Sequence, residues 1–449
     1  MNILGIMGAC PPDIWDGNDE AMYDEKHPER FINKWMHGSG ATLFIDENLV
    51  GALSEERFTR IKYDGNYPEN CISELLNKAN LKKSDIDHVA FVTGASLWSG
   101  TGSLFPNVAT DFLKKEFENA NVRVVDHHHA HACASWFTSG FDEANVLTFD
   151  HSGNVIPVKK SEGLVFSIIP EDPEDQNNQN ECMVVSNLNL ANDPIHPNTP
   201  YSKSFHLDNF SFALADRENG ISCVHHNVWS HKKFHFGGFY SYASGLVLNI
   251  VKNVEEYSTS HHSPRERETY AGKIMGYSAW GDYNKIAEWL DDPFLIIKND
   301  YDFPQVIENP NFQLMELYHR CNWEKSVKPE DLASWVQYIF EKYFIELIQS
   351  IPPIFKKDNL CLGGGCALNV ITNSRLLEDG LFKDVHVNTA PSDDGLHFGS
   401  ACFLVYEYLN KIPVIGDNLG CIGLDYNSEQ IESAMNDRGI MSGEPNEIV

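Results

Sequence analysis

Short apolar runs bounded by turn residues alternate along the chain with apolar stripes of helical spacing. Runs of this kind predict strands at residues 3–8, 41–45, 49–53, 89–92 and 122–125. The second and third runs flank the turn residues Asp46, Glu47 and Asn48, so they predict a β-hairpin. Pro68 begins a stripe of helical spacing that continues to Ala79. Strands and helices that alternate in this way are typical of the α/β class.

A second unit of the same kind begins with the apolar run at residues 144–149. This predicted strand ends at Asp150 and, like the first strand, is followed by a loop of small residues. The repetition predicts an internally duplicated nucleotide-binding fold of the actin and sugar-kinase type. Further on, Pro329 begins a stripe at residues 332–347 that predicts a helix packed in the core. Two polar stretches are predicted to be a long loop and an exposed insertion: residues 10–36 and 160–235.

Composition narrows the class of protein. The chain has 449 residues, enough for about two or three domains. Its formal net charge of −30 argues against a binder of duplex nucleic acid, which needs a basic face. The 10 Cys include no C-x-x-C pair, which indicates reduced thiols in a cytoplasmic protein. The N-terminus lacks the features of a signal peptide, and no run approaches the roughly 18 apolar residues of a membrane span.

A histidine-rich segment is the strongest chemical feature. His127 and His131 are four positions apart, so on a helix both imidazoles lie on one face and can bind one metal ion. A zinc-protease motif needs glutamate after its first histidine, and here that residue is His128. Asp150 and Asp393 each follow a predicted strand and supply two carboxylates. The resulting two-nitrogen, two-oxygen set suits Fe(II), Mn(II) or Zn(II); the alternative is a solvated loop in a chain with 19 His.

A glycine turn offers a second candidate site. The strand predicted at residues 360–362 leads into three glycines and the start of a helix. Gly364 and Gly365 allow a ligand to approach the backbone closely, and a helix N-terminus favours anions. Asn369 and Asn373 are four positions apart and could bind a ribose or phosphate; the alternative is a helix cap with solvated amides.

Cations are scarce in this acidic chain, so two places where they occur are candidates for binding an anion. Residues 55–62 contain three of them, including Arg60. Lys273 lies between Gly272 and Gly276. A single cation of this kind is more often a surface charge than a phosphate ligand.

In their order along the chain, these segments resemble the O-carbamoyltransferase family, whose members decorate antibiotics and nodulation factors. The matching segments are residues 37–41, 55–62, 127–132, Asp150, 272–276, 364–369 and 393–395. The loop after Met7 and the region 160–230 depart from the pattern.

The resemblance implies an actin-like (ASKHA, ribonuclease-H-like) fold, related to the subunit that makes threonylcarbamoyladenosine in tRNA. Residues 1–410 would form this domain, with lobes at about 1–143 and 144–410. In the family, a C-terminal YrdC-like domain makes carbamoyl-adenylate from carbamoyl phosphate and ATP. Residues 411–449 are expected to lead into such a domain, which is on a separate chain, cut off because this sequence is a fragment, or absent. Alone, the chain is therefore expected to transfer the carbamoyl group but not to activate it.

The resemblance also implies roles for individual residues. Fe(II) or another divalent transition metal would be bound by His127, His131, Asp150 and Asp393. Adenylate binding is assigned to Gly364, Gly365, Asn369 and Asn373, with Lys273 at the phosphate. Contacts to the carbamoyl group or acceptor are assigned to His37 and Arg60. His128 would be either a base or a support for the metal ligands.

The predicted partner is a small-molecule alcohol, with neither duplex nucleic acid nor a membrane. One alternative is an actin-like ATPase or small-molecule kinase, which would use magnesium bound through oxygen ligands. Another is a non-catalytic protein that presents an acceptor or a tRNA end, although the strong acidity argues against tRNA.

Overall fold

The computed structural model describes thirteen stretches of the chain: residues 1–9, 21–24, 27–33, 37–92, 112–150, 155–157, 205–229, 236–252, 264–298, 303–322, 324–416, 423 and 426–437. Within these stretches, no helix combines the length and apolar character that crossing a membrane requires.

The first sheet has five strands in the order β5-β4-β1-β6-β7. Its strands are β1 (Asn2–Met7), β4 (Gly40–Ile45), β5 (Asn48–Ser54), β6 (His88–Val92) and β7 (Asn121–Val124). β4 runs antiparallel to both β1 and β5, whereas β6 and β7 run parallel to β1. The predicted strands and the predicted hairpin are therefore confirmed.

The second sheet repeats this pattern, with the order β11-β10-β8-β14-β15. Its strands are β8 (Glu143–Phe149), β10 (Phe205–Asp216), β11 (Gly220–Trp229), β14 (Asn359–Gly363) and β15 (Asp384–Val387), and β9 (Val155–Pro157) pairs beside β10. β10 is antiparallel to β8 and β11, and β14 and β15 are parallel to β8. Two sheets with one strand order and one set of directions confirm the predicted α/β, duplicated actin-like (ribonuclease-H-like) fold.

The prediction of an insertion at residues 160–235 is wrong for β10 and β11, which are integral strands of the second sheet. β10 is apolar on both faces: Phe210 and Phe212 pack in one core cluster, and Ala213 and Ala215 in another. Both faces are covered, so the strand lacks the alternation that marks a half-exposed strand. Residues 171–179 lie outside the described residues.

Part of the predicted loop at residues 10–36 is also a hairpin. β2 (Ala21–Asp24) pairs with β3 (His27–Asn33) in a separate two-stranded sheet. The remaining residues of that loop lie outside the described part of the chain.

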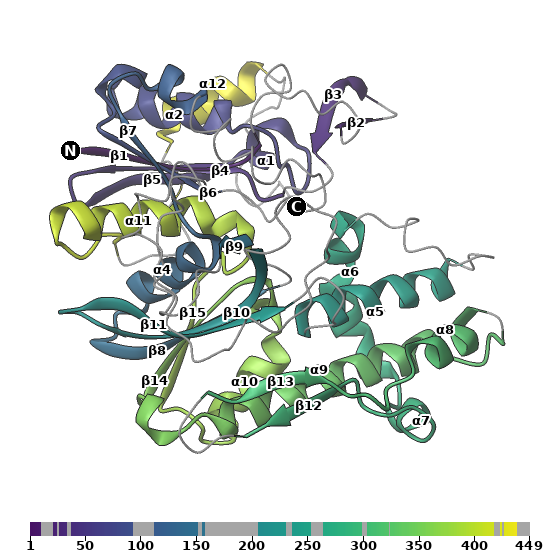
Figure 1. Cartoon of the computed structure of the whole chain (residues 1–449). Helices are drawn as coiled ribbons and strands as arrows, with labels where there is room; N and C mark the ends of the chain where they lie inside the picture. The colour runs from purple at the N-terminus through teal and green to yellow at the C-terminus, as the bar shows by residue number, and fades with distance from the viewer. Residues whose placement is uncertain are drawn as a thin grey trace.

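Two helices stack between the sheets (Figure 1). α4 (His127–Ser139) contacts β8 and β14 of the second sheet, and α11 (Leu396–Leu409) contacts β1, β4 and β6 of the first. α4 and α11 also pack directly against each other. The other face of the first sheet is covered by α2 (Glu69–Ala79), which follows Pro68 as predicted and lies after the short α1 (Glu56–Thr59).

Helices also form a layer that packs on the outer face of the second sheet and extends beyond it (Figure 1). They are α5 (Phe236–Val251), α6 (Pro264–Tyr277), α7 (Asn284–Ala287), α8 (Leu314–Asn322), α9 (Pro329–Ser350) and α10 (Val370–Glu378), with the hairpin β12 (Phe294–Ile297) and β13 (Gln305–Glu308) beside them. α9 is the predicted core helix and begins with Pro329 at its first position. α12 (Ser428–Asp437) contains no buried residue.

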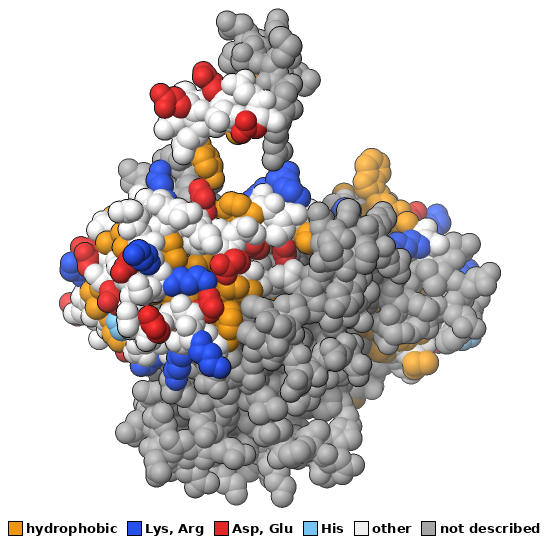
Figure 2. Space-filling model, turned by 90° about the horizontal axis from the view of Figure 1, so that it is seen from above, with side chains coloured by type: hydrophobic (Ala, Val, Ile, Leu, Met, Phe, Trp, Pro, Cys, Tyr) orange, Lys and Arg blue, Asp and Glu red, His pale blue; other side chains and the backbone are white. Residues whose placement is uncertain are grey.

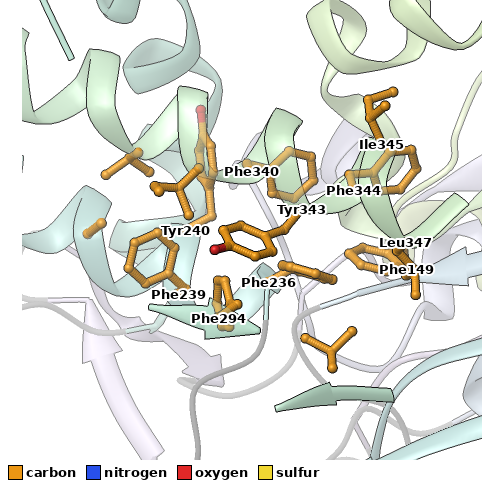
Figure 3. Packing of buried hydrophobic residues seen from close by; sticks show 14 of the residues in the cluster. Phe149, Phe236, Phe239, Tyr240, Phe294, Phe340, Tyr343, Phe344, Ile345 and Leu347 are labelled. Atoms are coloured by element: carbon orange, nitrogen blue, oxygen red, sulfur yellow. The ribbon is translucent and has the colours of Figure 1, made fainter. Parts of the chain in front are cut away.

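Aromatic rings fix the end of β8, where the second sheet reaches the candidate site (Figure 3). Phe149 stacks on Phe236 at 5.2 Å between ring centroids and meets Phe344 edge-on at 5.3 Å. Burial of one such side chain is worth about 1.5–3 kcal/mol. Because Asp150 directly follows Phe149, this packing fixes the position of the backbone that carries the Asp150 carboxylate.

Candidate metal centre

The first turn of α4 positions two histidine rings at one point. The Asp126 carboxylate caps the helix by accepting a hydrogen bond from the His129 backbone N–H at 2.8 Å. His127 and His131 follow one turn apart, both buried, and their Nε2 atoms lie 3.2 Å apart. The spacing in the sequence therefore predicted the relative orientation of these rings.

Two carboxylates from elsewhere in the chain complete the group. Asp150 follows β8, and its Oδ2 lies 2.9 Å from His131 Nε2 and 3.5 Å from His127 Nε2. Asp393 begins the 3₁₀ turn η7 (Asp393–Gly395) before α11, and its Oδ1 lies 3.4 Å from His127 Nε2. The four candidate ligand atoms all lie within 4.8 Å of one another.

Opposite charges are concentrated in this buried group. Burial lowers the pKa of His127, but the charge of Asp393 and a hydrogen bond with Asp150 outweigh burial and hold that pKa well above its usual value. Burial raises the pKa of Asp150, but its hydrogen bonds with His127 and His131 hold it well below the usual range. Both carboxylates are therefore anionic at neutral pH.

The donor set fits a divalent transition metal. Metal–nitrogen and metal–oxygen bonds are about 2.0–2.2 Å long, so two ligand atoms on one ion lie at most about 4.4 Å apart. The His–His and His–Asp separations of 2.9–3.5 Å satisfy that limit. The group as a whole spans up to 4.8 Å, so binding of one ion would draw its outermost atoms together by a few tenths of an ångström. Two imidazoles and two carboxylates match the set predicted from the sequence.

His37 lies against the outer side of this group. Its Nε2 is 3.6 Å from Oδ2 of Asp393. The other oxygen of this carboxylate, Oδ1, faces the histidine pair. The backbone of Gly38 makes this approach possible, because it has φ of 74° and a Cβ there would lie 2.6 Å from the Asp394 nitrogen. The Tyr63 ring meets the His37 ring edge-on at 6.1 Å. The sequence analysis did not identify Tyr63, although the tyrosine follows directly after the 55–62 segment.

His128 is buried beside the group rather than within it. Its ring centroid lies 5.9 Å from that of His127, and its backbone carbonyl accepts a hydrogen bond from Thr148 Oγ1 at 3.3 Å. Neither of the two roles proposed for His128 is tested by this position.

The glycine turn lies against the candidate metal centre. Gly364 has φ of 86°, and a Cβ there would lie 2.3 Å from the Phe149 carbonyl oxygen. A Cβ on Gly365 would lie 3.2 Å from Asp150 Oδ1. The Gly364 N–H donates to the Pro391 carbonyl at 2.8 Å, which joins the turn to the segment that carries Asp393. The predicted glycine turn therefore lies directly beside the predicted metal ligands.

Asn369 and Asn373 make hydrogen bonds to backbone atoms that follow the glycine turn. The Asn369 Oδ1 caps α10 by accepting the Thr372 backbone N–H at 3.1 Å. The Asn373 Nδ2 donates to the Ala367 carbonyl at 2.7 Å. The helix-cap alternative thus describes Asn369, and contact of either amide with an adenylate stays a prediction.

Arg60 and Lys273 lie outside the group of four. Arg60 follows α1 in a left-handed conformation with φ of 61° and an exposed side chain. Lys273 is exposed on α6, with its ammonium 4.3 Å from the Tyr270 ring centroid. Among the described residues, neither cation forms an ion pair with the four candidate ligands, so their roles stay predictions. Where the face in Figure 2 is described, Lys and Arg side chains are interspersed with Asp and Glu.

Known proteins similar to this chain include bacterial relatives that match most of its length. An uncharacterized protein (sll1178) of Synechocystis sp. is 23% identical over 433 residues, covering 85% of this chain and 57% of that protein. Nodulation protein NolNO of Sinorhizobium fredii is 22% identical over 410 residues, covering 85% and 48%. Nodulation protein U of Bradyrhizobium diazoefficiens is 52% identical over 82 residues, covering 17% and 14%. The chain thus spans about half the length of the first two relatives.

Solved structures match at low sequence identity. Full-length HypF in its phosphate- and nucleotide-bound form is 12% identical, with a TM-score of 0.41, covering 83% of this chain and 45% of that chain. Component A of the Acidaminococcus fermentans (R)-2-hydroxyglutaryl-CoA dehydratase is also 12% identical, with a TM-score of 0.39, covering 92% and 100%.

A family model matches the later part of the second sheet, from β10 to β15, and the helices on its outer face. Residues 206–402 match the model described as Carbamoyltransferase N-terminus. The match includes nearly all of β10 and all of β11, so the region predicted to depart from the family at residues 160–230 belongs to it from residue 206 onward. These residues therefore match the N-terminal region of carbamoyltransferases, and the resemblance of the chain to the O-carbamoyltransferase family is confirmed.

Proposed function

We propose that this chain transfers a carbamoyl group from carbamoyl-adenylate to the hydroxyl of a small-molecule acceptor, and that the transfer depends on a metal. The observation that carries the proposal is the buried group of His127, His131, Asp150 and Asp393, with His37 against the outer oxygen of Asp393. The family match and the similarity to nodulation proteins support carbamoyl transfer as the reaction class.

The four clustered side chains would hold Fe(II) or another divalent transition metal. A bound metal of this kind supplies a Lewis acid that polarises a carbonyl oxygen. The protein contributes the anchoring: two ligands from one turn of α4, one from the end of β8 and one from the turn before α11. Because all four are buried, their positions are set by packing before a substrate arrives.

His37 is the proposed proton acceptor. Its side chain is 19% exposed, so an acceptor molecule can reach it, and Asp393 stabilises its protonated form at 3.6 Å. In the transfer, the acceptor oxygen forms a bond to the carbamoyl carbon while its proton passes to His37. The bond from that carbon to the phosphate oxygen of the adenylate breaks, and AMP leaves with the electron pair.

The glycine turn is proposed to bind the adenylate. Gly364 and Gly365 allow a phosphate or ribose to lie against the backbone beside Asp150. Lys273 and Arg60 are proposed to contribute positive charge to the donor or acceptor. Formation of carbamoyl-adenylate from ATP and carbamoyl phosphate is proposed for a YrdC-like domain or a separate chain.

A single-turnover assay tests the proposal. Purified protein of known metal content would be mixed with synthetic carbamoyl-adenylate and a panel of alcohols, and AMP and carbamoylated product would be quantified. His131→Ala should lose both the metal and the transfer. His319→Ala is the matched control, because His319 lies half exposed on α8 and outside the clustered ligands.

Transfer retained by metal-free His131→Ala would refute the role of the metal. Hydrolysis of ATP without carbamoyl phosphate, together with no reaction of carbamoyl-adenylate, would favour the ATPase or kinase alternative instead.

A further inference from the structure

The core helix α9 carries a buried amide among its apolar residues. Gln337 is 4% exposed, and its neighbours on the buried side include Trp335, Val336 and Phe340. A buried amide without partners is costly, so an apolar residue of similar size would be the simpler choice for packing alone. The partners of Gln337 therefore indicate why a polar residue stands there.

Gln337 uses its full hydrogen-bonding capacity. Its Oε1 accepts from the Tyr240 hydroxyl at 3.0 Å and from Asn369 Nδ2 at 2.9 Å. Its Nε2 donates to Glu341 Oε1 at 2.9 Å and to Asn369 Oδ1 at 3.1 Å. Two of these bonds make a reciprocal amide pair between Gln337 and Asn369.

Asn369 connects this pair to the glycine turn. It directly follows the 3₁₀ turn η6 (Gly365–Leu368), and its Oδ1 also caps α10. At the other end of η6, Gly365 lies beside Asp150, and the Gly364 N–H donates a hydrogen bond to the Pro391 carbonyl. A continuous series of contacts thus runs from the core of the second lobe to the candidate metal centre.

We propose that Gln337 is a positioning residue for the glycine turn, and that through Asn369 it sets the affinity of this turn for an adenine nucleotide. The amide pair holds the residue at the end of η6 in one orientation, so the backbone of Gly364 and Gly365 is preformed for the ligand. The step from turn geometry to nucleotide affinity rests on the function proposed above.

Two substitutions separate positioning from general stability. Gln337→Leu removes both bonds to Asn369 with little change in volume. Tyr240→Phe is the matched control, because it removes one buried bond to Gln337 and leaves the amide pair intact. Asn369→Ser is a second test, because serine can still cap α10 but is too short to pair with Gln337.

The measurements are amide hydrogen exchange across residues 364–368 without ligand, and the Kd for AMP by calorimetry, on protein of matched metal content. Gln337→Leu and Asn369→Ser should speed exchange and weaken AMP binding by roughly tenfold. Tyr240→Phe should stay close to wild type in both.

Unchanged exchange in Gln337→Leu, or an equal effect in Tyr240→Phe, would overturn the proposal. If wild-type protein binds no AMP but the exchange responds as expected, the positioning role stands and the adenylate-binding function fails. The two proposals can therefore fail separately.

Discussion

Replacement of Gly364 by alanine should destabilise the site more than any other single methyl group added in the glycine turn. Gly364 has φ of 86°, in the left-handed region that disfavours residues with a Cβ. With ψ of 163°, this conformation is essentially limited to glycine and costs an L-residue about 1–3 kcal/mol. The new Cβ would also lie 2.3 Å from the carbonyl oxygen and 2.6 Å from the carbonyl carbon of Phe149.

The clash adds to the backbone strain because the atoms it meets cannot rotate away. They belong to the end of β8, which the surrounding aromatic rings hold in place. Overpacking of this kind costs about 1–3 kcal/mol. The combined loss is about 2–6 kcal/mol, and relief of the clash must displace either the turn or Asp150.

Gly272→Ala adds the same methyl group but should increase the stability of the protein. Gly272 lies within α6, and nothing lies within 4 Å of a Cβ built there. Alanine in a helix interior is more stable than glycine by about 0.5–1 kcal/mol. The assay is chemical denaturation of both variants with metal content measured in parallel. Equal midpoints for the two variants, with wild-type metal content in Gly364→Ala, would refute this account of the turn.

Three further predictions concern single side chains. Asp393→Asn removes a negative charge from the candidate ligand set, so metal affinity measured by competition with a chelator should fall by more than the roughly 10–100-fold that is usual for a residue behind the ligands. Burial lowers the pKa of His397 to about 4, and the backbone of Asp394 opposes this only in part. In the unfolded chain the pKa of His397 is near 6.5, so between pH 6.5 and 4 the unfolded chain binds more protons than the folded chain. The free energy of unfolding should therefore fall as pH decreases from 6.5 to 4, by up to about 3 kcal/mol. Denaturation measured against pH should show a weaker slope in His397→Asn. Glu55→Ala removes a buried carboxylate that accepts the Cys71 N–H at 3.0 Å, so the free energy of unfolding should fall by about 1–3 kcal/mol, and no change in thermal denaturation would contradict this.

The sequence predicted those parts of the site that follow from local periodicity. A four-residue spacing on a helix places His127 and His131 on one face whatever surrounds them. Asp150 and Asp393 follow β8 and β15, which run parallel on either side of β14, so the carboxyl ends of both strands lie at the same edge of the sheet. The fold was predictable for a similar reason, because both repeats begin with a buried strand and a loop of small residues.

Features that depend on a distant partner were not predictable. An asparagine at position 369 can bind a ligand or cap a helix, and the local sequence does not distinguish the two. Its inward orientation depends on Gln337, 32 residues earlier. β10 was mistaken for part of an insertion, because a strand covered on both faces has no alternation of polar and apolar residues. Its neighbour β8 lies about 60 residues before it, and that separation leaves no local pattern in the sequence.

Contact between backbones determines the geometry of the candidate metal centre. A Cβ on Gly399 of α11 would lie 1.9 Å from the Ala130 carbonyl oxygen of α4, the residue just before His131. A Cβ on Gly5 of β1 would lie 2.0 Å from the His397 carbonyl oxygen of α11. The two glycines therefore allow α4, α11 and the first sheet to approach more closely than side chains would permit. Because α11 begins just after Asp393, this close approach is what brings Asp393 to the histidine pair. The four ligands thus depend on the packing of α11 against α4 and the first sheet, and a substitution there would alter the centre without touching any ligand.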